Sequence, residues 1–501
     1  MPQADASVDR KRRLKYPVIM EHKNLKTFKD DAYKYFCELS KIPRGSGNEK
    51  DISNYLVSFA KENRLEAVQD KSLNVLICKN GSKGRENEAP LILQAHMDMV
   101  CEKNENIAHD FLKDPIIPII EGDWVKAQGT TLGADNGSGV ALIMAVLAAD
   151  NLSHPPLETI LTTAEETGCT GAANFDVSLI KGKRLLNLDS GEEGIFCVAC
   201  AGGVIIDTKV PVEYENVPAG FIPYKVMVKG LVGGHSGSDI DKGRLNANLL
   251  MARLLEKLMQ ADIRLIDIKG GAKMNAIPRE CSAWIAISEN HLADLKLMVT
   301  QTEAEFKAAA TADRDLTITL ERSDIPGKLM NRATLRNVIN TILHTPSGVQ
   351  SMSNNIKGLV QTSNNPGVIT CSEDTVVLTN FLRSSDYADM NLVIEKIKTQ
   401  AEKFGAKAYA LEGFPIWEYK AYSPLRDTMS AVFKEMYGKD PVSAAIHGGL
   451  ECAIFAKKIP DGDFSSIGGP DIVDMHSPDE RMSISSFNRT CDFLVMVLNK
   501  L

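Results

Sequence analysis

Five short segments of this chain each place one metal-binding side chain among small residues and glycines. Two of these side chains are imidazoles and three are carboxylates, a set of donors that suits a pair of divalent cations such as zinc. Because the segments lie far apart in the sequence, a fold that uses all of them must bring distant parts of the chain to one place. The candidate metal ligands, in chain order, are His96, Asp135, Glu166, Asp189 and His476.

Each segment is weak evidence when it is taken alone. A His-x-Asp pair is more often a satisfied polar pair on a strand, and a Glu-Glu pair is more often a solvated surface. The shared context changes this interpretation, because three of the candidates arrive at the ends of apolar runs that predict buried strands. Open α/β sheets gather their ligands at such strand ends. The three runs are 89–94, before His96; 157–163, before Glu166; and 184–188, before Asp189.

Asp135 stands instead at the start of a predicted helix. The run that follows, from Val140 to Ala149, is apolar on nearly every side, which indicates a buried helix. The helix macrodipole stabilises a carboxylate at this end. A plain helix cap explains Asp135 equally well when the segment is taken alone, and only the other candidate ligands favour a metal-binding role.

Two further carboxylates lie next to candidate ligands but are free for other work. Asp98 lies two residues beyond His96, on the same face of a strand, where it can orient the imidazole. Glu165 directly precedes Glu166 and can move a proton. Metals that polarise a carbonyl and acidify water, together with a carboxylate that transfers protons, are the requirements of metal-assisted hydrolysis.

The amino-acid sequences of four segments resemble those of a known family. Gln-Ala-His96-Met-Asp98-Met-Val, Gly-Ala-Asp135-Asn136-Gly, His447-Gly-Gly-Leu-Glu451-Cys and Met-His476-Ser-Pro are similar to the cocatalytic-zinc metallopeptidases that include aminoacylases, glutamate carboxypeptidases and dipeptidases. The dipeptidase branch is the most similar, and the resemblance runs from about residue 25 to the C-terminus. It implies an α/β catalytic domain of the zinc-exopeptidase type, with a mixed sheet between helices and an inserted α+β lid.

The resemblance also implies roles for the residues that match. Asp135 bridges two metal ions, which are expected to be zinc, with manganese or cobalt as alternatives. Asp189 completes the ligand shell of one metal and His476 that of the other, while His96 and Glu166 bind one metal each. Glu165 takes a proton from the attacking water and delivers it to the leaving amine.

Four polar residues of the expected lid and its return segment match substrate-binding positions of the family. His235 stabilises the oxyanion, in its own subunit or in the partner subunit, and Arg383 pairs with the carboxylate of a free C-terminus. Asn275 also matches a polar position. Glu451 holds the free α-amine in one interpretation and is a solvated charge at a helix start in the other. A cation-binding Glu and an anion-binding Arg together select a substrate with two close termini, namely a dipeptide.

Composition excludes several other classes of protein. The net charge of −8 argues against a nucleic-acid partner, and no apolar run is long enough for a membrane span. The N-terminus lacks the apolar region of a secretory signal. The ten cysteines form no disulfide framework, and Cys197 and Cys200 fit core thiols of a cytoplasmic protein better than a redox pair.

The pattern of predicted elements divides the chain into four stretches. Helices are expected near 27–39, 50–60, 246–260, 333–344, 390–404 and 485–498. The lid reads as a ferredoxin-like α+β unit that is approximately duplicated, and the family forms dimers through it. The expected divisions are a disordered tail at 1–24, a first catalytic part at 25–205, a lid at 206–411 and a second catalytic part at 412–501.

Two alternatives to a dipeptidase remain open at the level of the sequence. One is a related amidohydrolase: an aminoacylase, a deacetylase or a carboxypeptidase. The other is a non-catalytic binding descendant, which would typically have lost ligands, whereas this chain retains all five candidates and both proton-transferring carboxylates.

Overall fold

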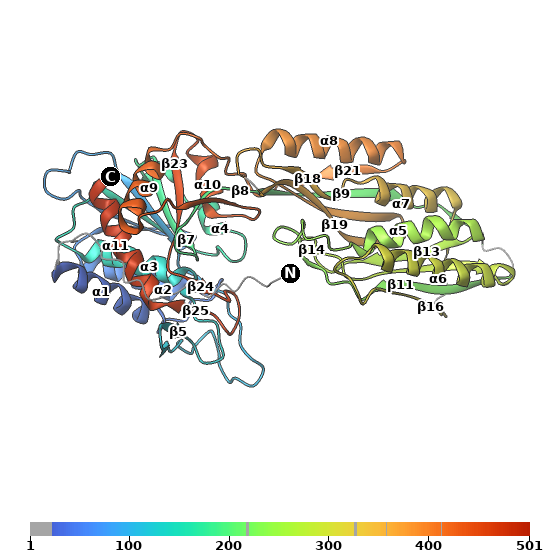
Figure 1. Cartoon of the computed structure of the whole chain (residues 1–501), viewed down its shortest axis with the longest axis horizontal. Helices are drawn as coiled ribbons and strands as arrows, with labels where there is room; N and C mark the ends of the chain where they lie inside the picture. Colours follow the sequence, from blue (N-terminus) through green and yellow to red (C-terminus); the bar gives the residue numbers. More distant parts are fainter. Residues whose placement is uncertain (1–22, 217–219, 325–327, 357, 412) are drawn as a thin grey trace, which may run out of the picture. The chain divides into compact units, whose positions relative to one another are not determined.

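The computed structural model describes residues 23–501 except 217–219, 325–327, 357 and 412. The chain forms two compact units (Figure 1). Unit 1 runs through Cys197 and adds Tyr422–Ser443 and Asp461–Leu501, and unit 2 consists of Val198–Ala421 and Ala444–Pro460. The sequence-derived boundaries after residues 205 and 411 stay predictions, and the first of them falls inside strand β9 (Gly202–Pro211).

The expected disordered tail at 1–24 falls almost wholly outside the described residues. The two residues of it that are described belong to a helix, α1 (Lys23–Leu39), so the assignment of residues 23 and 24 to the tail is wrong. A second helix, α2 (Lys50–Glu62), follows and confirms the predicted helix at 50–60.

An eight-stranded sheet forms the centre of unit 1. Its central strands β6, β3, β7 and β23 are parallel to one another, and antiparallel strands flank them on both sides. The parallel strands therefore present their carboxyl ends at a single edge of the sheet. The order across the sheet is β1 (Glu66–Gln69), β2 (Val75–Lys79), β6 (Leu157–Thr162), β3 (Leu91–His96), β7 (Arg184–Ser190), β23 (Asp463–Gly468), β8 (Ile195–Cys200) and β22 (Val442–Ile446).

Helices cover this sheet. The apolar helix predicted after Asp135 is α3 (Ala134–Ala148), which packs against β3 and β7 and is buried along almost its whole length. Helix α9 (Pro424–Tyr437) packs against β23 and against the C-terminal helix α11 (Ile484–Lys500). Because α3 contacts the sheet on one side and α1 on the other, its all-round apolar character is explained by burial.

Shorter elements complete unit 1. A small sheet has the order β24 (Ile472–Val473), β25 (Arg481–Ser483), β5 (Trp124–Lys126) and β4 (Ile119–Glu121). The hairpin formed by β24 and β25 carries residues 474–480 at its tip. The short helices α4 (Thr170–Asn174) and η1 (Val177–Leu179) connect β6 to β7.

Unit 2 is built on one antiparallel sheet of nine strands. The order is β16 (Thr317–Arg322), β11 (Phe221–Lys229), β15 (Cys281–Ser288), β13 (Arg264–Gly270), β19 (Val360–Cys371), β20 (Thr375–Ser384), β9 (Gly202–Pro211) and β21 (Lys407–Ala410), with β18 (Gly348–Met352) also paired to β19.

The sheet of unit 2 is two ferredoxin-like halves joined edge to edge. In chain order one half is β11-α5-β13-β15-α6-β16, and the other is β9-α7-β19-β20-α8-β21, with the first half inserted after β9. Both halves place their strands in the order fourth, first, third, second, and the two second strands, β13 and β19, pair with each other. The predicted duplication is therefore confirmed in the topology.

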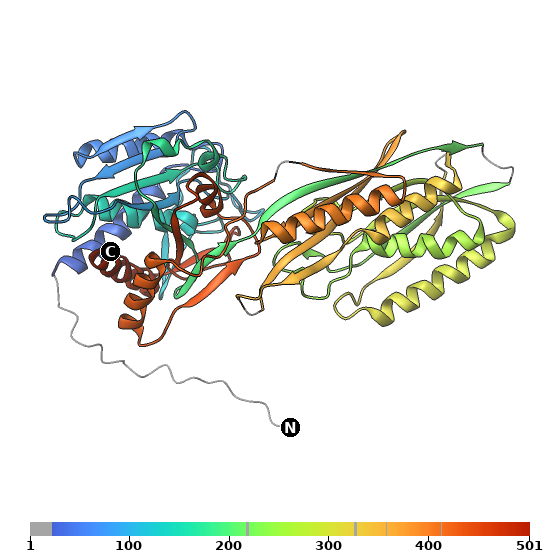
Figure 2. The same cartoon turned by 90° about the horizontal axis from the view of Figure 1, so that it is seen from above.

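Four helices lie side by side along the sheet of unit 2, in the order α6, α5, α7, α8 (Figures 1 and 2). Their apolar faces and the strands enclose one large core that includes Leu254, Ile285 and Val338. The helices are α5 (Ala247–Leu258), α6 (Leu292–Ala309), α7 (Arg332–His344) and α8 (Tyr387–Lys403). Among the described residues, no helix combines the length and the apolar character that a bilayer span requires.

Smaller features of unit 2 hold the polar residues predicted from the sequence. Two-residue strands β12 (Gly234–His235) and β14 (Ala276–Ile277) pair with each other, as do β10 (Tyr214–Glu215) and β17 (Leu329–Met330). Helix α10 (Glu451–Lys458) follows β22.

Cys197 and Cys200 of β8 are buried thiols, as expected.

Candidate functional site

The five candidate metal ligands all lie in unit 1, where the parallel strands of its sheet end. His96 is the last residue of β3, Asp189 is the next-to-last residue of β7, and Glu166 follows β6 by four residues. His476 lies at the tip of the β24–β25 hairpin, beyond the end of β23. Asp135 enters from the start of α3. The fold therefore brings all five together, because neighbouring parallel strands end at one edge.

The Asp135 carboxylate lies between two imidazoles. Its Oδ1 atom is 3.2 Å from His96 Nε2, and its Oδ2 atom is 3.2 Å from His476 Nε2. Each imidazole also faces a second carboxylate: His96 Nε2 is 3.5 Å from Asp189 Oδ1, and His476 Nε2 is 3.0 Å from Glu166 Oε2. Two donor sets, each of one imidazole and one carboxylate, thus share Asp135 between them.

The side chain of Asp135 does not act as a plain helix cap. Asp135 has extended torsion angles, φ −81° and ψ 110°, so α3 is kinked there and its regular part begins beyond Asn136. Both of its carboxylate oxygens point to imidazoles and not to the first amides of the helix. The helix-cap alternative that the sequence left open is therefore not what the structure contains.

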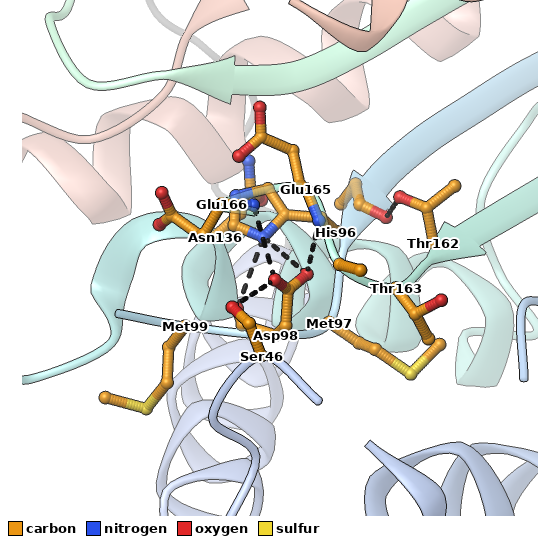
Figure 3. A network of polar contacts seen from close by, with 12 residues as sticks. Ser46, His96, Met97, Asp98, Met99, Asn136, Thr162, Thr163, Glu165 and Glu166 are labelled. Atoms are coloured by element: carbon orange, nitrogen blue, oxygen red, sulfur yellow. Dashed lines mark hydrogen bonds and ion pairs between the residues drawn. The ribbon is translucent and has the colours of Figure 1, made fainter. Parts of the chain in front are cut away.

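Asp98 orients the ring of His96. Its Oδ1 atom is 3.3 Å from His96 Nδ1 (Figure 3), whereas Asp135 faces the other ring nitrogen, Nε2. The Ser46 hydroxyl donates to Asp98 Oδ2 at 2.7 Å, and the Glu165 amide donates to Oδ1 at 3.2 Å. A fully buried carboxylate held on several sides can keep the imidazole in one orientation, with Nε2 directed at the candidate metal position.

The two glutamates after β6 follow a strained turn. Ala164 has a positive φ of 51°, and its amide donates to Glu49 Oε1 at 3.2 Å. A left-handed conformation at a residue with a side chain persists only where its surroundings hold it, and such residues cluster at functional sites. The Glu165 carboxylate accepts a weak hydrogen bond from the Cys169 thiol at 3.5 Å.

The charges of the site balance one another through protons on the two imidazoles. The hydrogen bonds that His476 donates to Asp135 and Glu166 raise its pKa from 6.5 to about 10. Burial alone would lower the pKa of His96, but the nearby carboxylates, Asp189 foremost, outweigh it and raise that pKa well above 6.5. Burial raises the pKa of Glu166. Both imidazoles therefore carry protons at neutral pH until a cation displaces them.

The donor set fits divalent cations. One ligand atom from each of His96, Asp135 and Glu166 lies within 4.8 Å of the others. The Oε1 atom of Glu166 is buried without a hydrogen-bond partner within the described residues, which is costly for a carboxylate unless a cation takes that place. Imidazole and carboxylate donors in this ratio suit zinc and its neighbours in the first transition row.

A second set of predicted residues comes together in unit 2. The strand pair β12–β14 joins His235 to the segment of Asn275, whose carbonyl accepts the Ser236 amide at 2.9 Å. The Ser238 amide donates to His235 Nδ1 at 3.2 Å. The other ring nitrogen, Nε2, lies 3.2 Å from Arg383 Nη2, and a guanidinium nitrogen can only donate. A neutral imidazole accepts at one nitrogen alone, so the two contacts favour opposite tautomers of His235.

Arg383 makes this cluster electropositive. Its side chain is buried, with 7% exposed, and within the described part of the chain no carboxylate pairs with it. Burial lowers its pKa to about 10, so it remains charged at neutral pH. Burial and Arg383 together lower the pKa of His235, and the same two causes lower that of His447 to about 4. A buried cation without an anion favours binding of one.

Glu451 does not have the exposed position that one interpretation of the sequence required. It begins α10 and is fully buried. The interpretation as a solvated charge is therefore wrong, because a helix start in this fold can lie against the interior. Its role toward a substrate amine stays a prediction.

Sequence reasoning missed three residues that support these clusters. Arg44, with 2% exposed, donates to the carbonyl oxygens of Met97, Asp98 and Gly133. Glu480 accepts backbone amides before Asp135. His447 lies 2.7 Å from the Ser363 hydroxyl beside Arg383. The one available signal was position, since His447 stands within a motif that the sequence had already singled out and Glu480 follows the motif Met-His476-Ser-Pro by two residues.

Comparison with known proteins identifies relatives over almost the entire chain. Residues 92–500 match the peptidase family M20/M25/M40. The chain is 39% identical to the cytosol non-specific dipeptidase of Escherichia coli over 469 residues, which are 93% of this chain and 96% of that protein.

Solved structures agree with this match. The aminoacylhistidine dipeptidase of Vibrio alginolyticus superposes with a TM-score of 0.84 at 36% identity, over 93% of this chain and 96% of that one. The aminopeptidase PepT of Bacillus cereus has a TM-score of 0.54 at 15% identity, over 94% of this chain and 98% of that one, and shares the fold alone.

The position of Asp135 between two donor sets predicts a loss of both metals when it is removed. Asp135→Ala takes one donor from each set and removes the negative charge between two cations, so both should bind more weakly. Metal content of the purified variant, measured by elemental analysis, should fall well below that of the unmutated protein. Retention of two metals per chain would contradict the bridging role.

The raised imidazole pKa values predict that metal binding releases protons. A cation needs both rings unprotonated at Nε2, so its affinity should rise with pH between 6 and 8, by about tenfold per unit for each proton released. Competition with a chelator at several pH values measures this slope. His476→Ala should reduce the slope by about one proton, and an affinity that does not change with pH would contradict the assignment.

Proposed function

The chain belongs to the peptidase family M20/M25/M40, and from this premise we propose that it is a metal-dependent dipeptidase with a dinuclear metal centre. The substrates are dipeptides, Xaa-His among them. The observation that carries the proposal is the Asp135 carboxylate, whose two oxygens each face a separate imidazole–carboxylate pair. Metal content and dipeptide turnover, measured together before and after chelation, test it directly.

The residues of unit 1 divide the chemistry among them. Divalent cations held by His96, Asp135, Glu166, Asp189 and His476 would, when bound, polarise the scissile carbonyl and acidify water. Glu165 accepts the proton from the attacking water and delivers it to the leaving amine, because it neighbours the candidate ligand Glu166 and is not itself part of either donor set. Asp98 keeps the His96 ring in its orientation.

The residues of unit 2 select the substrate. His235 donates to the developing oxyanion, and Arg383 binds the substrate carboxylate. Asn275 adds a polar side chain to this set. The proposal is supported by a buried guanidinium without a carboxylate partner among the described residues and by the 3.2 Å distance between its Nη2 atom and Nε2 of His235. Glu451 holds the free α-amine, so that both termini of a dipeptide are recognised.

The preferred metal is zinc, with manganese or cobalt as alternatives that the same donors accept. We place the protein in the cytoplasm as a homodimer, in keeping with the cytosolic relative and with the composition. A non-catalytic binding protein of this fold is disfavoured because all five candidate ligands and Glu165 lie together with complementary charges. An aminoacylase, a deacetylase or a carboxypeptidase differs in which substrate termini it accepts.

The role of Glu165 predicts a specific loss of turnover. Glu165→Gln removes the proton-transferring group but no metal donor, so kcat should fall by about 10²–10⁴ while metal content is retained. Steady-state kinetics with a dipeptide and elemental analysis of the same sample check both parts. A variant that keeps most of its turnover would show that Glu165 is not the base.

Recognition of both termini predicts strict requirements on the substrate. Amidation of the C-terminus or acetylation of the N-terminus should each lower kcat/KM of the unmutated enzyme by about 10²-fold or more, because a buried charge loses its partner. Tripeptides should be poor substrates, since one more residue adds about 3.5 Å between the termini.

Matched variants assign each penalty to one residue. Arg383→Ala should shrink the penalty for amidation and leave the penalty for acetylation unchanged, and Glu451→Ala should do the reverse. Comparable turnover of dipeptides, tripeptides and N-acetylated dipeptides by the unmutated enzyme would contradict this recognition and favour a broader amidohydrolase.

A further inference from the structure

The backbone segment that carries Asp135 is held by a carboxylate from the far end of the chain. Glu480 Oε2 accepts the amides of Leu132 and Gly133 at 2.8 and 3.0 Å, and Oε1 accepts those of Ala134 and Asp135 at 2.8 and 3.3 Å. The carboxylate is buried, with 2% of Glu480 exposed. Four consecutive amides at the start of α3 therefore converge on one side chain, which fixes the direction in which Asp135 leaves the backbone.

Glu480 belongs to the same tight turn as a candidate metal ligand. The Glu480 amide donates to the Ser477 carbonyl at 3.1 Å, which closes the turn directly after His476. The flanking strands β24 and β25 pair with each other, Val473 with Arg481, and this pairing holds the two ends of the turn together. One rigid turn therefore sets both the imidazole of His476 and, through Glu480, the segment of Asp135.

Arg44 holds the other side of the same segment. Its Nη2 donates to the Gly133 carbonyl, while its Nη1 donates to the carbonyls of Met97 and Asp98 at 3.0 and 3.1 Å. Glu480 thus binds the amides of the segment and Arg44 binds a carbonyl, and Arg44 also joins the segment to the end of β3. The peptide groups around Asp135 have charged partners on both sides, which restricts their rotation.

We infer that Glu480 is a positioning residue for the dinuclear centre: it holds residues 132–135 so that the two oxygens of Asp135 face His96 and His476, and it couples that segment to His476. This inference rests on the proposed metal centre. A neutral side chain cannot replace Glu480, because the amide nitrogen of a glutamine would face two backbone amides that need an acceptor. Groups that orient metal ligands typically contribute 10–100-fold to metal affinity.

A purely structural role predicts a different outcome, and unit 1 contains a matched control. Glu158 of β6 is also buried, with 7% exposed, and its carboxylate accepts the amides of Lys181 and Gly182 at 2.8–3.0 Å. No candidate metal ligand lies on the segment that Glu158 holds. Glu158→Gln and Glu480→Gln therefore make the same chemical change, and both should lower Tm.

The experiment measures the affinity of the full-length protein for Zn²⁺ alone, by competition with a chelator, together with Tm. Glu480→Gln should weaken Zn²⁺ binding about 10–100-fold, and turnover should recover toward that of the unmutated enzyme at saturating Zn²⁺. Glu158→Gln should leave the affinity within about twofold. In the metal-free protein, amide hydrogen exchange of residues 132–135 should be faster in Glu480→Gln than in the unmutated protein.

The other outcomes each overturn a definite statement. An unchanged Zn²⁺ affinity in Glu480→Gln, or equal weakening in both variants, overturns this inference and leaves the proposed function intact. A failure of the unmutated protein to bind Zn²⁺ overturns the proposed function and this inference with it. If Glu480→Gln does not fold, Glu480→Asp replaces it, because it keeps the charge but is one methylene too short to reach all four amides, and its affinity should still fall.

Discussion

The carboxylate of Asp135 can lie between two imidazoles only because the surrounding charges and backbone hold it there. Three carboxylates crowded into a largely buried space repel one another, and without a cation the protons of His96 and His476 balance that charge. A bound metal pair takes over this balance with a stronger and more directional interaction. The parallel strands, the start of α3 and the β24–β25 hairpin all serve to bring these groups to one edge.

The two units carry complementary chemistry. Unit 1 gathers carboxylates and imidazoles, which suit cations, whereas unit 2 gathers Arg383, His235 and His447, which suit an anion. The duplicated ferredoxin-like sheet supplies a rigid support for the cationic set, because Arg383 stands on β20, a strand paired on both sides.

Much of the fold was predictable from local patterns. The helix at 333–344 and the helix at 485–498 follow from apolar periodicity and appear as α7 and α11. Strand β23 was missed, although it lies inside the sheet, because its sequence Asp-Phe-Ser-Ser-Ile-Gly has no apolar pattern. Its serines are nevertheless fully buried. Burial of small polar residues is a property of the assembled sheet and leaves no periodic signal.

The sequence by itself singled out the candidate metal ligands, because three of them follow apolar runs and four segments together resemble the metallopeptidase family. It also determined that Asp98 and Glu165 stand next to them. Only the tertiary structure decided which imidazole pairs with which carboxylate, that Glu451 is buried, and that Glu480 and Arg44 hold the segment before Asp135. For Glu480 and Arg44 the reason is physical. They bind peptide groups far away in the sequence, and any chain segment that the fold brings near can make such a contact.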